Sequence, residues 1–121
     1  MKTGFVVFAH GSSVESANEA VRAVVRDVAR RGGLELVEAA FLEGGTPGLE
    51  GAVERLVGSG AGRIVVLPYF LTLGLHLQRD LPRIVDALSR KYAGVEIRVT
   101  APLDGHPALA AVLLERAREA T

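Results

Sequence analysis

The sequence predicts an α/β fold, a four-stranded parallel sheet with helices on both faces. Four short apolar runs are typical of buried strands, at residues 4–9, 34–42, 63–70 and 95–101, and the first is enriched in β-branched and aromatic residues. Each run is followed by a stretch in which apolar residues recur at the spacing of one helix face. Because parallel strands need crossover connections, and such crossovers normally carry helices, this alternation favours a parallel sheet covered on both faces.

Each helix is predicted from a set of apolar residues spaced three or four positions apart. In chain order the faces are Ala17, Val21, Val24 and Val28; Leu49, Val53 and Leu56; Leu81, Val85 and Leu88; and Leu109, Val112 and Ala117. We expect all four faces to lie in the core. The arrangement is then a flavodoxin-like α/β sandwich, with strand order 2-1-3-4.

Capping and helix-breaking residues mark the expected helix boundaries. The expected starts are Ser12 with Glu15 three residues later, Thr46 before Pro47, Asp80 near Pro82, and His106 before Pro107. The expected ends are Gly32-Gly33, the glycines between 58 and 62, and Gly94.

Length and composition exclude several classes of function. The 121 residues fit one domain, which we assign to residues 1–121. The 14 basic and 14 acidic side chains cancel, so no net charge favours binding to nucleic acid or to an anionic membrane. The absence of cysteine excludes disulfides, thiolate catalysis and iron–sulfur ligation. The longest apolar stretch, Ile64–Leu75, is too short to span a bilayer, and without a secretory signal we expect a cytoplasmic protein.

Chemically active side chains follow the predicted strands. Ligands of open α/β sheets bind beyond the carboxyl ends of the strands, where the strand order reverses. His10 follows the first strand, Glu43 the second and His76 the third, while Asp104 and His106 follow the fourth. All three histidines of the chain are therefore expected at one edge of the sheet.

Each of these residues also has a structural interpretation. His10 could be a loop or capping residue, His106 could only begin a helix, and Glu43 could be merely solvated. His76 is the more unusual, because Leu75 and Leu77 flank it. We expect its imidazole to be desolvated and neutral at cellular pH.

The set His10, His76 and Glu43 has the character of an open metal site. Neutral imidazoles suit borderline divalent metals such as iron, cobalt, nickel and zinc, and one carboxylate can complete such a set. No H-x-x-x-H spacing supports it locally, so the inference depends on the convergence of the loops. The phosphate-binding loops of nucleotide enzymes and the G-x-S-x-G elbow are absent. A phosphoryl-accepting His10 is an alternative, although such sites expect an arginine where Ala9 stands.

Four segments together carry a resemblance to a known family. "HGS" after the first strand, "AFLE" at the end of the second, "RIVVLPYFLTLGLH" with "DLP" shortly after, and "GHP" at the last helix resemble the short CbiX-type sirohydrochlorin chelatases. The similarity covers nearly the whole chain. It implies ATP-independent insertion of a divalent metal into sirohydrochlorin, on the route to cobalamin, siroheme or a nickel tetrapyrrole. Co²⁺ is the first expectation, with Fe²⁺ or Ni²⁺ possible, and no organic cofactor is implied.

The resemblance also assigns roles to residues. It implies that His10 and His76 are catalytic and bind the metal, and that Glu43 is the carboxylate near the site. It implies a homodimer with the site in a cleft between subunits. A non-catalytic tetrapyrrole or metal carrier would need the same cleft and remains an alternative.

Sirohydrochlorin carries many carboxylates, and we expect a few residues to bind them. The backbone N–H groups of Ser12 and Ser13 could bind one at a helix start, although plain helix capping explains both serines equally well. Arg79 could bind another carboxylate of sirohydrochlorin, although a surface arginine usually contacts only solvent. His106 is a further candidate for binding the macrocycle. Gly11 is expected to let the chain turn tightly between His10 and this helix start.

Overall fold

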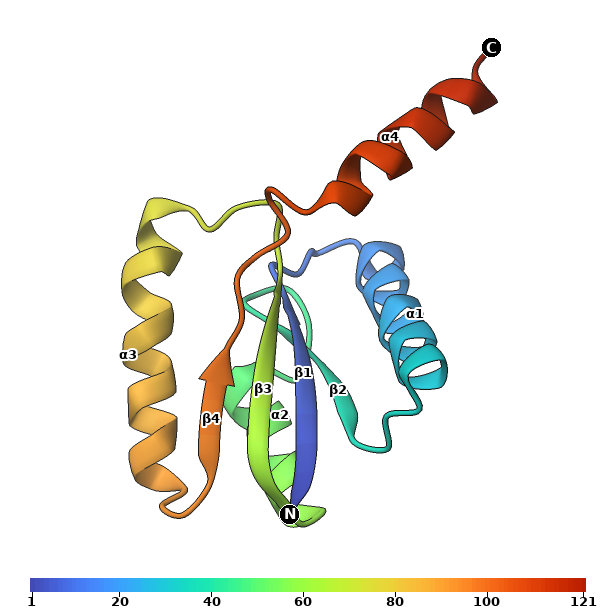
Figure 1. Cartoon of the computed structure of the whole chain (residues 1–121). Coiled ribbons are helices and arrows are strands. Elements are labelled where there is room, and N and C mark those ends of the chain that lie inside the picture. The colour runs from blue at the N-terminus through green and yellow to red at the C-terminus, as the bar shows by residue number, and fades with distance from the viewer.

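The computed structural model describes residues 1–121, in which four strands alternate with four helices (Figure 1). In chain order the elements are β1 (Lys2–Ala9), α1 (Glu15–Gly32), β2 (Val37–Phe41), α2 (Leu49–Gly58), β3 (Ala61–Tyr69), α3 (Leu75–Lys91), β4 (Glu96–Val99) and α4 (Pro107–Glu119). All four predicted strands and all four predicted helices are present. No helix is both long enough and apolar enough to cross a membrane.

The four strands form one parallel sheet in the order β2-β1-β3-β4, as predicted. β1 lies between β2 and β3, where Val6 is opposite Glu38 on one side and Val66 on the other. Both central strands are apolar because neighbouring strands and helices cover most of their surface. The reversal of strand order lies between β1 and β3, so the loops after these two strands meet at one edge.

The core has two parts, one on each face of the sheet. Val6, Phe8 and Val66 point toward α2 and α3, where they pack with buried leucines of both helices. Val7 and Ala9 point the other way and pack with α1 and β2. This alternation follows from the two-residue period of a strand, which sends successive side chains to opposite faces. The predicted coverage of both faces by helices is confirmed for α1, α2 and α3.

Several expected helix starts are wrong. α3 begins at Leu75 after Gly74, so that Asp80 and Pro82 lie inside the helix. Its buried residues Leu77, Leu81 and Leu88 pack against the sheet, and this packing outweighs the cost of an interior proline.

The starts of α1 and α2 also differ from the expected residues. α1 begins at Glu15 after Val14, because the Ser12 hydroxyl instead accepts a 3.0 Å hydrogen bond from the N–H of Val14 in the preceding turn. α2 begins at Leu49, so Thr46 lies outside it. The first residue of α2, Leu49, is buried, so packing rather than a local capping signal accounts for this start.

Other helix boundaries agree with the sequence. α1 ends at Gly32, and Gly33 follows with φ of 61°, a left-handed conformation that favours glycine. α4 begins at Pro107, and His106 caps it by accepting a 3.0 Å hydrogen bond at Nδ1 from the N–H of Ala108.

The last helix departs from the expected packing. α4 has no buried residue and projects away from the sheet (Figure 1). The expectation that Leu109, Val112 and Ala117 lie in the core of their own chain is therefore wrong. The reason is the direction in which the segment after β4 leads into α4, which no local pattern encodes.

Candidate functional site

A cavity of about 410 Å³ lies at the carboxyl edge of the sheet. The end of β1 contributes His10, and the first two turns of α3 contribute His76 and Asp80. Apolar side chains form much of the remaining wall, among them Leu42, Phe70, Leu75 and Leu77. The cavity thus lies where the strand order reverses, at the edge where the sequence predicts a site.

His10 lines this cavity and pairs with Glu43, which lies beside it and outside the cavity wall. Their Nε2 and Oε1 atoms are 3.5 Å apart, and both side chains are more than half exposed, at 61% and 70%. The His10 Nδ1 atom lies 3.1 Å from the carbonyl oxygen of Gly11. A neutral imidazole that donates from Nδ1 keeps its lone pair on Nε2, the atom that faces the carboxylate. This nitrogen can therefore accept a proton or a metal ion.

The backbone holds the His10 and Glu43 loops against each other. The Glu43 N–H donates a 3.0 Å hydrogen bond to the His10 carbonyl, which continues the pairing of β1 with β2. Gly11 has φ of 87°, and a β-carbon there would lie 1.7 Å from the carbonyl oxygen of Glu43. The loops can approach this closely only because Gly11 carries no side chain.

Asn18 on α1 holds the same two loops together through side-chain hydrogen bonds. It is 1% exposed, on the first turns of α1. Its Oδ1 accepts a 2.9 Å hydrogen bond from the Ser12 N–H, and its Nδ2 donates to the carbonyls of Ser12 at 2.8 Å and Gly44 at 3.0 Å. One buried amide thereby fixes the spacing of the loops that carry His10 and Glu43.

His76 lies in the first turn of α3 and is exposed. The expectation that flanking leucines desolvate it is wrong, because Leu75 is 71% exposed and only Leu77 turns into the core. Neighbours in a helix point in different directions, so apolar residues before and after a histidine do not enclose it. Asp80 lies one turn later on the same face of α3.

The structure brings His10 and His76 to one cavity, with Glu43 beside His10. No group of three or more histidine, aspartate or glutamate side chains lies close enough together to hold a metal ion. The cavity wall therefore carries two separate sets of polar groups, His10 with Glu43 next to it, and the His76 and Asp80 side chains.

The other candidate residues lie outside the cavity wall. The Ser12 N–H is not free to bind an anion, because Asn18 accepts its hydrogen bond. Ser13 precedes α1 and is exposed, and Arg79 is exposed on α3. His106 caps α4.

Two residues of the site were missed by sequence reasoning. The spacing of His76 and Asp80, four residues apart in "HLQRD", places both on one helix face, and this signal was available. Asn18 stands in register with the apolar positions Val21 and Val25 of α1. A polar residue in an apolar stripe indicates a buried hydrogen-bonding role.

Comparison with known proteins identifies the family. The CbiX family profile matches residues 4–120, almost the whole chain. The chain belongs to the CbiX family. A sirohydrochlorin cobaltochelatase from Methanopyrus kandleri is 30% identical over 95% of this chain and 94% of its own length. A chloroplastic sirohydrochlorin ferrochelatase from Arabidopsis thaliana is 31% identical over 93% of this chain, which spans only 50% of that relative.

A solved structure of the family has the same fold. The CbiX protein from Marinobacter aquaeolei VT8 superimposes with a TM-score of 0.84, at 28% identity, over 97% of this chain and 95% of that one. The resemblance found in the sequence is thus confirmed at the level of the family and the fold.

Proposed function

We propose that the protein inserts a divalent metal ion into sirohydrochlorin without ATP. The observation that most directly supports this proposal is a cavity at the carboxyl edge of the sheet that is lined by His10 and His76, with Glu43 paired to His10. The protein that holds this cavity is a member of the CbiX family. The relatives with long matches are named for cobalt or iron insertion into sirohydrochlorin. We take Co²⁺ as the first metal substrate, with Fe²⁺ and Ni²⁺ also accepted.

The side chains suit the proton balance of this reaction. Metallation places a dication in the macrocycle and releases two pyrrole protons, so the site must deliver a metal and accept protons. His10 has a lone pair at Nε2 that can take a proton, and the Oε1 atom of Glu43 lies 3.5 Å from this nitrogen. We propose that His10 and His76 together hold the incoming ion. When the ion moves to the macrocycle, the freed Nε2 of His10 and the Glu43 carboxylate each accept one of the two pyrrole protons.

The incomplete ligand set supports transfer rather than storage. A site with few protein ligands leaves coordination positions open, and the pyrrole nitrogens can fill these positions as the ion moves. A closed cage of three or four side chains would bind the ion too tightly to release it. No such cage exists among the His, Asp and Glu residues of the chain.

We also propose a homodimer. The cavity of about 410 Å³ lies near the lower end of the range for small-molecule sites, which bury most of their ligand. A large planar macrocycle with many carboxylates needs a second wall. A second copy of the chain can supply that wall, together with basic residues for the carboxylates.

An anaerobic absorbance assay tests the proposal. Purified protein is mixed with sirohydrochlorin and Co²⁺, Fe²⁺ or Ni²⁺, with and without ATP, and the spectral change is followed at several protein concentrations. We expect multiple turnovers, a rate proportional to enzyme, no effect of ATP, and Co²⁺ at least as fast as the other metals.

Two outcomes would contradict the proposal. A single stoichiometric spectral change without turnover would indicate a tetrapyrrole or metal carrier. Release of phosphate from phosphate esters, with no rate above the uncatalysed metallation, would instead indicate a histidine-dependent phosphoryl-transfer enzyme.

A further inference from the structure

The face of the sheet that carries α1 is only partly covered. α1 packs over β1 and β2, which leaves the same face of β3 open toward β4. A groove of about 280 Å³ lies there. It runs between Val24 and Val28 on α1, Leu67 and Tyr69 on β3, and Leu103 after β4. Seven of its nine lining residues are hydrophobic, so water is a poor occupant.

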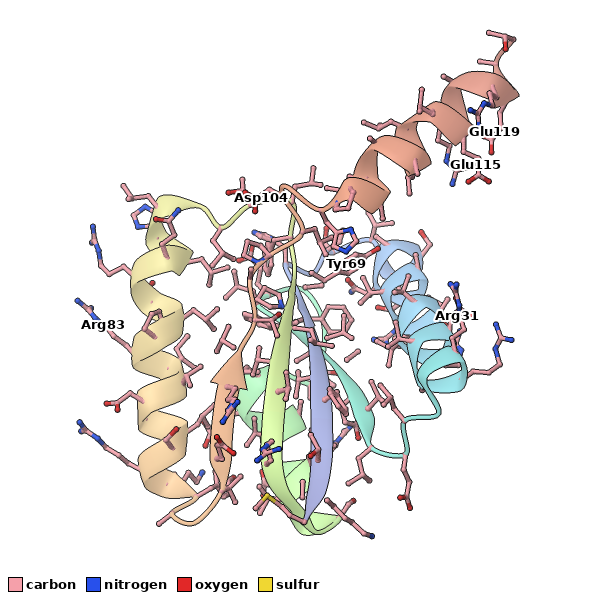
Figure 2. The ribbon with its side chains drawn as sticks, viewed as in Figure 1. Arg31, Tyr69, Arg83, Asp104, Glu115 and Glu119 are labelled. Carbon is pink, nitrogen blue, oxygen red and sulfur yellow. The ribbon has the colours of Figure 1, made fainter.

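α4 carries an apolar stripe that nothing in its own chain covers. Leu109, Val112, Leu113 and Ala117 recur at the spacing of one helix face. Val112 is 50% exposed and Leu113 is 70% exposed. Figure 2 shows Glu115 and Glu119 on the outer part of α4, far from the sheet, and Tyr69 near the start of α4 on the side of α1. The groove and the stripe are thus two apolar surfaces without partners.

The segment before α4 is held in place. Thr100 donates a 3.0 Å hydrogen bond to the Val66 carbonyl, Leu103 a 2.9 Å bond to Phe70 and Asp104 a 2.7 Å bond to Leu71. These bonds anchor the segment to the end of β3 and direct α4 away from its own groove (Figure 1). For α4 to dock in its own chain, the backbone would have to reverse direction and break part of this anchoring.

The solvent-accessible surface area of the chain is larger than that of a typical folded monomer of its mass, as expected if a partner normally covers part of it. The chain exposes 7614 Å², whereas a folded monomer of 12.8 kDa exposes about 6,300 Å². The excess of about 1,300 Å² exceeds the roughly 800 Å² that each partner of a standard interface buries. A second copy that covers both α4 and the groove would account for this excess.

We propose that two copies exchange α4, each copy placing the stripe of Leu109, Val112 and Leu113 in the groove of the other. The exchange is reciprocal, so one two-fold axis satisfies both surfaces and the assembly closes as a dimer. The proposal rests on the homodimer proposed above and names its contact. The Arabidopsis relative, about twice as long as this chain, has room for a second lobe in one polypeptide.

Disulfide trapping between introduced cysteines tests the exchange, because the natural chain has no cysteine. One chain carries Val28→Cys in the groove, and a second, size-tagged chain carries Val112→Cys on α4. The two are mixed, allowed to exchange subunits and oxidised mildly. We expect a covalent heterodimer of the tagged and untagged chains. As a matched control, Arg83→Cys on the outer side of α3 (Figure 2) should give no heterodimer with Val112→Cys.

A chain carrying both Val28→Cys and Val112→Cys separates exchange from closure within one chain. Exchange yields a covalent dimer on a denaturing gel. A monomer with an internal disulfide would show that α4 folds back on its own sheet, and would overturn the proposal. Failure to form any Val28–Val112 disulfide in a protein that light scattering shows to be dimeric would overturn the exchange but not the homodimer. A strict monomer at about 10 μM would overturn both, while the metallation rate measures the proposed activity separately.

A charged residue in the stripe provides a second readout. Leu113→Asp should weaken the dimer by about 100-fold or more, because an apolar contact is lost and a carboxylate would be buried in each groove. Ala111→Asp, on the opposite side of α4, should leave the dimer affinity within about threefold. Both residues are exposed in the single chain, so neither change should prevent folding. Equal dimer affinity of the two variants would contradict the exchange.

Discussion

Replacing Asn18 by alanine should loosen the two loops that carry His10 and Glu43. The change removes three hydrogen bonds of 2.8 to 3.0 Å, which join α1 to Ser12 and to Gly44. Each is worth about 1 kcal/mol net, so the free energy of unfolding should fall by about 3 kcal/mol. A chain of 121 residues has an unfolding entropy near 0.25 kcal/mol per kelvin, and the melting temperature should therefore drop by about 12 °C.

Calorimetry and the metallation assay measure the two consequences separately. At 20 °C, where the Asn18→Ala variant is still folded, we expect its rate to fall roughly tenfold or more. The reason is that the His10 and Glu43 loops lose their fixed spacing, and small displacements of reacting groups are costly. Ser16→Ala is the matched control, on the exposed side of the same helix, and should shift the melting temperature by less than about 2 °C. If Asn18→Ala melts within about 3 °C of the natural protein, Asn18 does not fasten the two loops.

Three further changes test other parts of the site and fold. His10→Ala and His76→Ala should each lower turnover by roughly 100-fold or more with little change in melting temperature. The double variant should be scarcely slower than either single variant, because residues that act together are not additive. Near-normal rates in the single variants would show that these histidines are not catalytic. Gly11→Ala should destabilise the protein by about 2 kcal/mol or more, because the new β-carbon would meet the carbonyl oxygen of Glu43 at a positive φ. Gly74→Ala is the matched control, because Gly74 has a negative φ and open space at the β-carbon position. Thermal denaturation should show a lower melting temperature for the first variant and little change for the second. Hydrogen bonds from Arg63 and Arg98 lower the pKa of Glu96 below 4.5, so its ion pairs stabilise the fold above that pH and are lost as the pH falls. Glu96→Gln should therefore flatten the dependence of the melting temperature on pH below pH 4.5. An unchanged profile would contradict this assignment.

The sequence by itself determined the order and type of the elements and the edge of the sheet where the cavity with His10 and His76 lies. Apolar runs such as Phe5–Phe8 and the spaced faces of the helices depend on local sterics and on burial, which a one-dimensional pattern records. His106 before Pro107 and the glycines after Arg31 mark helix ends for reasons confined to one turn of backbone. Because a parallel α/β sheet gathers its strand ends, His10 and His76 were predictable at one edge.

Only the tertiary structure decided how distant segments meet. α3 begins well before Pro82 because its leucines pack on the sheet, and this packing outweighs the local penalty of proline. Asn18 contacts Gly44, which is 26 residues further along the chain, so its role cannot be seen in either segment alone. The exposure of His76 and the direction of α4 likewise depend on which surfaces other parts of the chain occupy. Free energies of burial depend on all the neighbours in space, whereas a sequence shows only the neighbours along the chain.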